Sequence, residues 1–403
     1  MRLDWKKKYV EVARNFSVDR EKTFLSGFNA NIDRVFRADE VLTRNPEEED
    51  LGSIESYEDL LKVLKYCKEN GKNKEIDIES YKPEIEGGET YIGGQGGIVS
   101  TFCSRIGTDS VIYTPFISEK LSEAMDSDIK TKSCEENSFT YIENALNSEK
   151  TKENMIFEFQ GDKTGRLILS DSLEGFEPVF MEDDDFLDFI DEKVDRFFFS
   201  GFHHISNEEI DTAKEQLKYL DTSIHLEYVY NDEDKARKIV NNIFPFVESI
   251  GCDGDEMEQI MEVKGMEKPQ NTREYIEKME KIARDSGIER FHVHTYNFHM
   301  CMVRKGYGID VERVLDSMLF GELCAIASAD KGDIPYLEDI RNFSMNNKHL
   351  KGEGKVRRIS DNGIIEKEDF YVLMIPIIIH EKPERLVGLG DLISSGSFFS
   401  EVF

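Results

Sequence analysis

Short apolar segments alternate with amphipathic segments along most of this 403-residue chain. The apolar segments are rich in aromatic and β-branched residues, which favour β-strands, and helical stretches separate them. They comprise residues 23–27, 110–114, 196–201, 223–227 and 290–294. The alternation predicts an α/β fold, with a mainly parallel sheet covered by helices on both faces. Because ligands of such sheets bind beyond the carboxyl ends of the strands, polar residues at those ends are the first candidates for a site.

Two segments interrupt the alternation. Residues 37–89 are charged and contain one clear helix near residues 57–69, while residues 133–169 resemble short strands at 155–159 and 166–169. We expect them to form a smaller, mostly β lid that is inserted into the α/β body. The predicted division assigns residues 1–36, 91–132 and 170–403 to the large domain, and residues 37–90 and 133–169 to the lid.

Composition excludes several kinds of partner. The net charge of −31, from 82 acidic and 51 basic residues, repels nucleic acid and anionic lipid. No apolar run is long enough to span a bilayer, and the basic N-terminus lacks the apolar centre of a signal peptide, so we expect a cytoplasmic protein. The six cysteines show no CxxC spacing, which disfavours a zinc cluster or a disulfide scaffold. No obligate protein partner is evident.

A glycine-rich turn near residue 390 carries one carboxylate. Here Val387-Gly388-Leu389-Gly390-Asp391 follows the apolar segment 371–379 and opens a helix. Its glycines allow a tight turn, and the free N–H groups of a helix start can bind an anion. A carboxylate beside that anion repels it unless a metal lies between them or the carboxylate takes a proton from an attacking hydroxyl. The combination of anion site and carboxylate therefore indicates phosphoryl transfer. The alternative is an ordinary helix start with an aspartate in its first turn.

Polar residues follow the first predicted strand. Asn31 and Asp33 project to one side if the chain stays extended. An amide beside a carboxylate offers both donors and acceptors, which suits sugar hydroxyls. The alternative is a turn in which both side chains bond their own backbone.

A second glycine-rich segment, Gly93-Gly94-Gln95-Gly96-Gly97, opens another predicted helix. Four glycines around one glutamine permit close approach of the backbone to a ligand. We therefore expect this segment to bind a ligand, with Gln95 as a polar contact.

Acidic and histidine residues end three further strands. His225-Leu226-Glu227 and the turn from Asp253 to Glu256 place carboxylates at neighbouring strand ends, where they can hold Mg²⁺ through its waters. Strand periodicity places His292 and His294 on one face, with Thr295 at the end. Hydrogen-bonded core histidines are the simpler interpretation of that pair.

The order of these motifs resembles that in the archaeal ADP-dependent sugar kinases of the ribokinase-like superfamily. The similarity runs from near Phe24 to the C-terminus. It implies a three-layer α/β/α sandwich with a mostly β lid over the sugar site. It also implies that ADP, rather than ATP, is the phosphoryl donor, that AMP is released and that Mg²⁺ or another divalent cation takes part. The motifs are Asn29-Ala30-Asn31-Ile32-Asp33, Gly93 to Ile98, His225-Leu226-Glu227, Asp253 to Glu256, His292 to Thr295 and Val387 to Asp391.

The resemblance also assigns roles by position. It implies that Asp391 is the catalytic base and that Gly388, Leu389 and Gly390 supply the backbone anion hole. The residues implied for the sugar pocket are Asn31, Asp33, Gly93, Gly94 and Gln95. Those implied near the nucleotide are His294, Thr295, Val387, Gly388 and Gly390. Those implied for the metal and its waters are Glu227, Glu256 and Asp253.

Two positions depart from the family pattern. Asp253 stands where the family has an asparagine, which adds a negative charge near the phosphates. Tyr91 precedes Gly93-Gly94-Gln95 at a position where relatives often carry arginine. A cationic contact made from that position would be missing here.

The acceptor sugar is the least constrained feature. Fructose 6-phosphate needs cations for its phosphate, and Lys163 and Arg166 on the lid are the candidates, although both also fit exposed hairpin charges. Glucose needs a further acidic contact, for which Glu75 or Glu89 is available. We expect phosphofructokinase activity, with glucose phosphorylation as a side or parallel activity. The alternatives are a glucokinase, an ATP-dependent ribokinase-like kinase and a non-catalytic nucleotide or sugar sensor.

Overall fold

The computed structural model describes residues 2–44, 46–78, 81–133, 138–159, 164–171, 184–385 and 387–403. Its main feature is a twelve-stranded sheet in the order β15-β17-β14-β13-β12-β11-β10-β1-β5-β6-β7, with β16 paired to β17. Its six central strands are parallel, as predicted; they are β13 (Arg290–His294), β12 (Ser249–Asp253), β11 (Ser223–Glu227), β10 (Arg196–Phe199), β1 (Thr23–Gly27) and β5 (Asp109–Tyr113).

Antiparallel strands extend one end of this sheet, and a short hairpin closes the other. The extension consists of β14 (Phe298–Arg304), β17 (Phe370–His380), β15 (Lys348–Lys351) and β16 (Ile364–Glu366). The hairpin consists of β6 (Lys130–Lys132) and β7 (Phe139–Tyr141), and β6 pairs with β5. The continuous apolar character of β17, which is buried through most of its length, matches its position inside the sheet.

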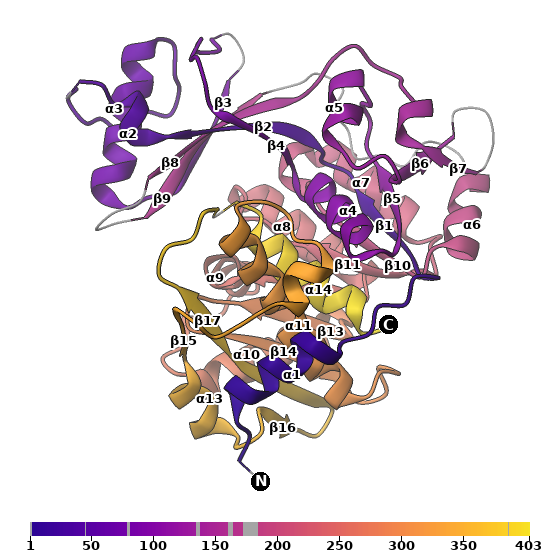
Figure 1. Cartoon of the computed structure of the whole chain (residues 1–403). Helices are drawn as coiled ribbons and strands as arrows, with labels where there is room; N and C mark the ends of the chain where they lie inside the picture. The colour runs from indigo at the N-terminus through magenta and orange to yellow at the C-terminus, as the bar shows by residue number, and fades with distance from the viewer. Residues whose placement is uncertain are drawn as a thin grey trace.

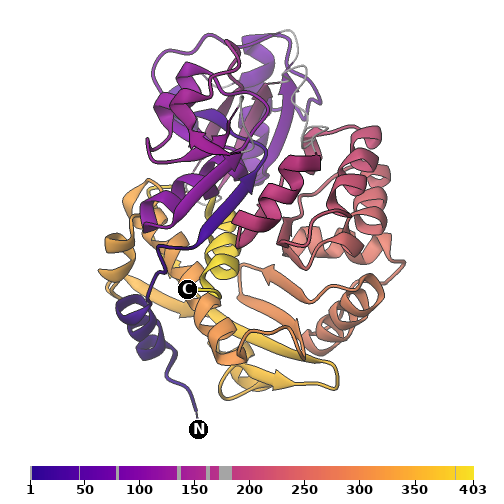
Figure 2. The same cartoon turned by 90° about the vertical axis from the view of Figure 1, so that its right-hand side faces the viewer.

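Helices cover both faces of the large sheet, which gives three layers (Figures 1 and 2). On one face, α4 packs against β1 and β5, α14 packs against β11 and β13, and α11 lies along α14. Helices α9 and α10 pack against β12 and β13 from the other side, where α7 and α8 join them. Their bounds are α1 Trp5–Asn15, α4 Gln95–Ile106, α7 Asn207–Leu217, α8 Glu233–Asn242, α9 Gly254–Val263, α10 Thr272–Ser286, α11 Val311–Lys331 and α14 Leu389–Ser400.

Shorter helices fill the connections: α5 Glu119–Ala124, α6 Asp184–Lys193, α12 Leu337–Arg341 and α13 Glu353–Ile359. None of the helices in the described part of the chain is long and apolar enough to cross a bilayer.

A second sheet of five strands lies beside the large one (Figure 1). Its order is β3-β9-β8-β2-β4. Alternation along each strand gives it two unlike faces. One face is apolar and packs Phe36, Phe157 and Leu167 against α3. The strands and helices are β2 Asn31–Arg37, β3 Lys74–Ile78, β4 Glu89–Gly93, β8 Glu153–Phe159, β9 Gly165–Asp171, α2 Ala38–Val41 and α3 Tyr57–Asn70.

The other face of this sheet is polar. Asp33 lies opposite Tyr91 on β4, and Glu158 lies opposite Arg166 on β9. These side chains alternate with the apolar ones that pack on α3, so they point away from that helix. The second sheet therefore presents charged and hydroxyl groups on its uncovered side.

The boundaries between the segments of the two sheets fall at different residues from the domain boundaries that we predicted. The boundaries expected after residues 36 and 90 fall inside β2 and β4, whose hydrogen bonds place them in the five-stranded sheet. Residues 139–141, expected in the lid, form β7 and pair with the large sheet. The error arose because strand partners far apart in sequence leave no local signal.

A buried ion cluster fixes the C-terminal helix to the large sheet. The carboxylate of Glu401, just after α14, accepts from Arg290 Nε at 2.7 Å, Arg196 Nη1 at 2.8 Å and the Tyr307 hydroxyl at 2.8 Å. Arg290 and Glu401 are fully buried. Because α14 begins with the Gly388–Asp391 turn, this cluster helps to hold that turn in register with β10 and β13.

We expect Glu401→Gln to lower the free energy of unfolding by roughly 3–5 kcal/mol, because it leaves two buried guanidinium charges without a counter-charge. Urea unfolding measures the loss. Glu233→Gln is the control, since its partner Arg237 and Glu233 itself are exposed and an exposed pair contributes less than about 1 kcal/mol. Equal effects of the two substitutions would contradict the structural role of Glu401.

Candidate active site

The turn before α14 has the form of an anion site. Gly388 is the N-cap with φ of 77°, a left-handed conformation that favours glycine. A Cβ there would also lie 2.7 Å from Ile98 Cδ1 on α4. The first helical hydrogen bond runs from Leu392 N–H to Gly388 O, so the preceding N–H groups stay outside the helical ladder and are available to an anion.

Asp391 lies in the first turn of this helix and is partly buried. The Gln95 side chain at the start of α4 lies beside the Asp391 carboxylate. Burial and the charge of Glu227 raise the pKa of Asp391 to about 6, while Gln95, His294 and Arg166 act to lower it. A carboxylate with such a pKa is ionised near neutral pH yet still basic enough to accept a proton.

Asn31 and Asp33 lie side by side on β2, as the extended conformation predicted. Asn31 Nδ2 donates to Asp33 Oδ1 at 2.6 Å, and both residues are buried. Burial raises the pKa of Asp33 to about 6, against the charge of Arg385 and the hydrogen bond from Asn31. This pair offers a carboxylate acceptor and further amide capacity on the polar face of the second sheet.

The adjoining glycines allow this close packing. A Cβ on Gly93 would lie 2.2 Å from Asp33 Cγ, and one on Gly94 would lie 2.4 Å from Asn29 O. Gly94 also has a φ of 71° and caps α4. Gln95 therefore starts its helix directly behind Asn31 and Asp33, and its Oε1 is buried with no hydrogen-bond partner.

Arg166 brings a positive charge from the lid toward this centre. It lies on β9, and its charge acts on Asp33, Glu75 and Asp391. Lys163 lies outside the described residues, so the second predicted lid cation stays an expectation. Glu75 is exposed on β3 of the same sheet, and Glu89 is exposed at the start of β4.

His294 lies directly under the glycine turn, since a Cβ on Gly390 would lie 3.1 Å from His294 Cε1. His294 Nε2 donates to Glu227 Oε1 at 3.1 Å. Burial alone would lower the pKa of His294, but the hydrogen bond to Glu227 and its charge raise it above the usual value. The hydroxyl of Thr295 instead closes the β13–β14 turn, donating to Phe298 O at 2.7 Å.

The carboxylate of Glu227 accepts hydrogen bonds from three side chains. It accepts from His294 Nε2, from His225 Nε2 at 3.0 Å and from Ser394 Oγ at 3.1 Å. Burial alone would raise its pKa, but the bonds from His225 and His294 lower it to about 2. Position 251 on the neighbouring strand requires glycine, because a Cβ on Gly251 would lie 2.0 Å from Glu227 Oε2.

The other two residues predicted for the metal form a helix cap. Asp253 Oδ1 accepts from the N–H groups of Asp255 and Glu256, and Glu256 Oε2 accepts from Asp253 N–H at 2.6 Å. Burial and the charges of Asp253 and Glu227 hold the pKa of Glu256 well above its usual range. In the part of the chain that the structure describes, no group of three or more His, Cys, Asp and Glu side chains can hold a metal by itself.

This arrangement fits a hydrated cation rather than an ion enclosed by protein ligands. Mg²⁺ usually keeps several waters and takes one or two carboxylates together with substrate phosphates. The carboxylates of Asp253, Glu256 and Glu227 repel one another. A cation placed between them and a nucleotide would relieve that repulsion. Glu227 itself, with three donors on its oxygens, is better suited to orient His294 than to coordinate the ion.

Sequence reasoning missed two buried cations beside the pocket. Lys152 precedes β8, is 5% exposed and places Nζ 3.2 Å from His204 Nε2. Burial lowers the pKa of Lys152 to about 8, although Glu75 and Asp33 act in the opposite sense. Arg385 is also 5% exposed and stacks on Tyr91. Neither residue belongs to a motif, and only the pairing of distant strands brings them to the site.

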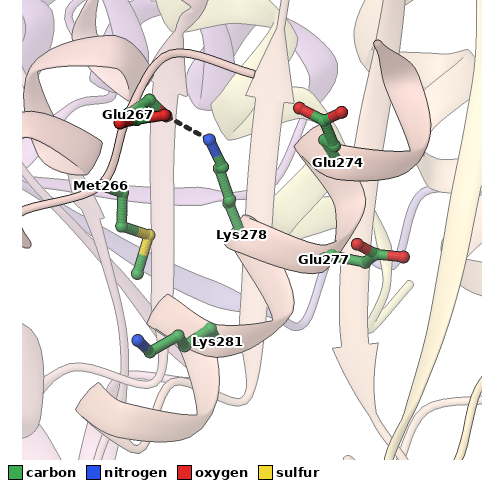
Figure 3. A pocket seen from close by; sticks show the side chains of 6 residues that line it. All are labelled: Met266, Glu267, Glu274, Glu277, Lys278 and Lys281. Atoms are coloured by element: carbon green, nitrogen blue, oxygen red, sulfur yellow. Dashed lines mark hydrogen bonds between the residues drawn. The ribbon is translucent and has the colours of Figure 1, made fainter. Parts of the chain in front are cut away.

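One surface hollow lies away from this centre, on α10 and the loop before it (Figure 3). It is lined by charged side chains of both signs, and Lys278 donates to the backbone carbonyl of Glu267. Its lining contains none of the predicted site residues; it consists of Met266, Glu267, Glu274, Glu277, Lys278 and Lys281.

Comparison with known proteins agrees with this architecture. An ADP-dependent kinase solved in complex with fructose 6-phosphate and ADPβS superimposes with a TM-score of 0.83, over 100% of this chain and 99% of that one, at 23% identity. The predicted α/β/α sandwich with a smaller second sheet is confirmed.

Relatives in sequence cover nearly the whole chain. The ADP-dependent glucose/glucosamine kinase of Pyrococcus furiosus is 27% identical over 96% of this chain and 95% of its own length. The ADP-specific phosphofructokinase of the same organism is 27% identical over 94% and 97%. Residues 22–400 match the conserved region of ADP-specific phosphofructokinases and glucokinases. The chain therefore belongs to the ADP-specific phosphofructokinase/glucokinase family.

Proposed function

We propose that this protein transfers the β-phosphoryl group of ADP to a hydroxyl of fructose 6-phosphate, forming fructose 1,6-bisphosphate and AMP. The observation that carries the proposal is the position of Asp391, which lies in the helix turn that can bind an anion and beside Gln95 of the proposed sugar pocket. The activities of the two relatives, phosphofructokinase and glucose/glucosamine kinase, support the same reaction class.

In the proposed reaction Asp391 accepts the proton of the sugar hydroxyl as that oxygen attacks the β-phosphorus. The bond between the β-phosphorus and the oxygen bridging to the α-phosphate breaks, and AMP leaves with that oxygen. Backbone N–H groups after Gly388 stabilise charge on the transferred group, and Arg166 adds a positive charge from the lid. Most of the catalysis is therefore positioning and electrostatics.

The remaining residues orient these groups. Glu227 holds His294 under the Gly388–Asp391 turn, which places an imidazole beside the proposed phosphate site. A divalent cation, bound through water near Asp253 and Glu256, would supply charge neutralisation for the phosphates. When the lid approaches the large sheet, its polar face excludes water that would otherwise hydrolyse the nucleotide.

Buried and partly buried cations favour a phosphorylated acceptor. Lys152 and Arg166 lie on or beside the polar face of the second sheet, and Lys163 is adjacent in sequence to β9. A dianionic sugar phosphate needs such charges because the rest of the chain is strongly acidic. Glu75 on the same sheet supports glucose as a parallel acceptor, since a carboxylate accepts from sugar hydroxyls.

The decisive assay crosses ADP and ATP as donors with fructose 6-phosphate and glucose as acceptors, and follows AMP or ADP release. We expect turnover with ADP and fructose 6-phosphate, slower turnover with ADP and glucose, and none with ATP. Turnover confined to ATP would overturn the choice of donor. Binding of sugar and nucleotide without turnover would identify a sensor instead.

Asp391→Asn tests the base directly. We expect kcat to fall by about two decades or more, because an amide cannot accept the hydroxyl proton. Equilibrium binding of AMP and sugar should persist. Asp234→Asn is the matched control, because Asp234 also occupies a first helical turn but is exposed on α8. Near-wild-type turnover of Asp391→Asn would refute the assignment.

The pH dependence of kcat provides a second test. Because the raised pKa of Asp391 is about 6, the base is increasingly protonated below that pH, and kcat should fall by about tenfold per pH unit there. The KM for ADP over the same range separates this effect from ionisation of the donor. A kcat that stays constant from pH 7 to pH 5 would exclude Asp391 as the titrating base.

A further inference from the structure

Arg385 joins the two sheets at the edge of the sugar pocket. It precedes the Gly388 turn on the large-sheet side, and its guanidinium lies 4.7 Å from the centre of the Tyr91 ring on β4. Its Nη2 donates to Ile92 O at 3.5 Å on the same strand. Tyr91 is the cross-strand partner of Asp33, and both side chains lie on the polar face. Stacking on Tyr91 therefore places the guanidinium beside Asp33.

The remaining donors of Arg385 are unused. Nε and Nη1 are buried and have no hydrogen-bond partner, and Nη1 lies 3.9 Å from Asp333 Oδ1, beyond hydrogen-bond distance. Burying two guanidinium N–H groups without partners is costly. Such a cost is retained most readily where a ligand supplies the missing acceptors.

The charges around Arg385 restrict the chemistry of that ligand. Asp33, Asp333 and Glu158 all act on its guanidinium. A phosphate placed among three carboxylates would be repelled, whereas a neutral hydroxyl can accept from the arginine and donate to Asp33. The arrangement therefore suits two neighbouring sugar hydroxyls rather than the phosphate of a sugar phosphate.

We propose that Arg385 is a sugar-binding residue, of whose unpartnered Nε–H and Nη1–H groups at least one donates to a hydroxyl oxygen of the acceptor while Asp33 accepts from the adjacent hydroxyl. This inference rests on the proposed function, because it assumes that the pocket at Asn31 and Asp33 binds a sugar. It adds a contact from the large-sheet side of the pocket. The acceptor would then be held between the two sheets and would favour their closed arrangement.

Equilibrium binding of fructose 6-phosphate, glucose and AMP to the full-length protein tests the proposal. Arg385→Met should weaken the binding of whichever sugar the wild type binds by about tenfold or more, because charge-assisted hydrogen bonds are lost. Where both sugars bind, the two losses should be similar. Arg385→Lys keeps the charge without the guanidinium's fixed N–H directions and should give a smaller loss. AMP affinity should stay within about twofold of wild type.

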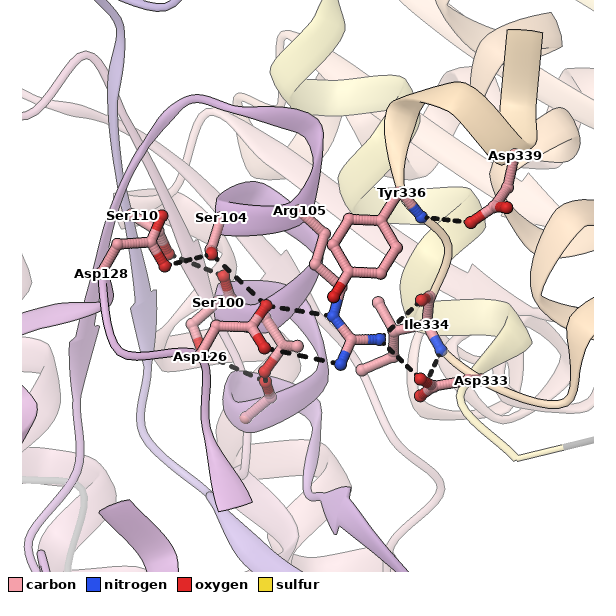
Figure 4. Close-up of polar contacts among 12 residues, drawn as sticks. Ser100, Ser104, Arg105, Ser110, Asp126, Asp128, Asp333, Ile334, Tyr336 and Asp339 are labelled. Carbon is pink, nitrogen blue, oxygen red and sulfur yellow. Dashed lines mark hydrogen bonds and ion pairs between the residues drawn. The ribbon is translucent and has the colours of Figure 1, made fainter. Parts of the chain in front are cut away.

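Arg105→Met is the matched control (Figure 4). Arg105 also stacks on a tyrosine, Tyr336, and binds the same Asp333, with Nη1 to Oδ2 at 2.8 Å. Its guanidinium N–H groups also donate to Asp126 and to the carbonyl of Ile334, and it does not face the sugar pocket. This variant should lower Tm while leaving sugar affinity within about twofold of wild type.

Three results would overturn the assignment. Wild-type sugar affinity in Arg385→Met would exclude the contact. A loss confined to fructose 6-phosphate would identify a phosphate contact instead, and an equal loss in Arg385→Met and Arg105→Met would identify a structural role through Asp333. If Arg385→Met does not fold, Arg385→Lys decides between the same outcomes. Failure of the wild type to bind fructose 6-phosphate would instead refute the proposed acceptor, and glucose would still test Arg385.

Discussion

The proposed reaction requires an anionic phosphoryl group to be held next to the carboxylate of Asp391 within a chain that carries a net charge of −31. Coulomb repulsion at that distance is large unless fixed positive charge lies close by. Here it comes from the first turn of α14 and from Arg166, with His294 beneath Gly390. The buried Glu401 cluster and the hydrogen bond from His294 to Glu227 keep these groups in place.

The two sheets contribute different chemistry to the centre. The large parallel sheet brings Glu227, Asp253 and His294 to the carboxyl ends of adjacent strands, which is where nucleotide phosphates are bound in folds of this type. The five-stranded sheet packs its apolar face on α3 and carries Asp33 and Arg166 on its polar face, from which the charge of Arg166 acts on both Asp33 and Asp391. Neither sheet alone supplies both the proposed sugar pocket and the proposed phosphate site, so the proposed reaction needs residues of both.

Local patterns predicted the central parallel strands, α3, β17 and the pairing of Asn31 with Asp33, because each depends on periodicity or on neighbours in sequence. They did not predict that β2 and β4 join the second sheet, since that depends on distant hydrogen bonds. For the same reason they missed Arg385, which reaches Tyr91 across almost 300 residues of sequence. The sequence motif predicted that Glu227 acts on the metal and its waters; the structure adds that its oxygens accept from two histidines and a serine. The sequence cannot show which acceptor atoms already receive hydrogen bonds within the protein.

Phosphorus-31 NMR of a single reaction mixture tests the central claim most directly. With ADP, a divalent cation and fructose 6-phosphate, the account predicts that the β-phosphate signal of ADP disappears and that AMP and a second phosphate monoester on fructose appear in equal amounts. Persistence of ADP in that mixture, together with consumption of ATP when ATP replaces it, would contradict the account.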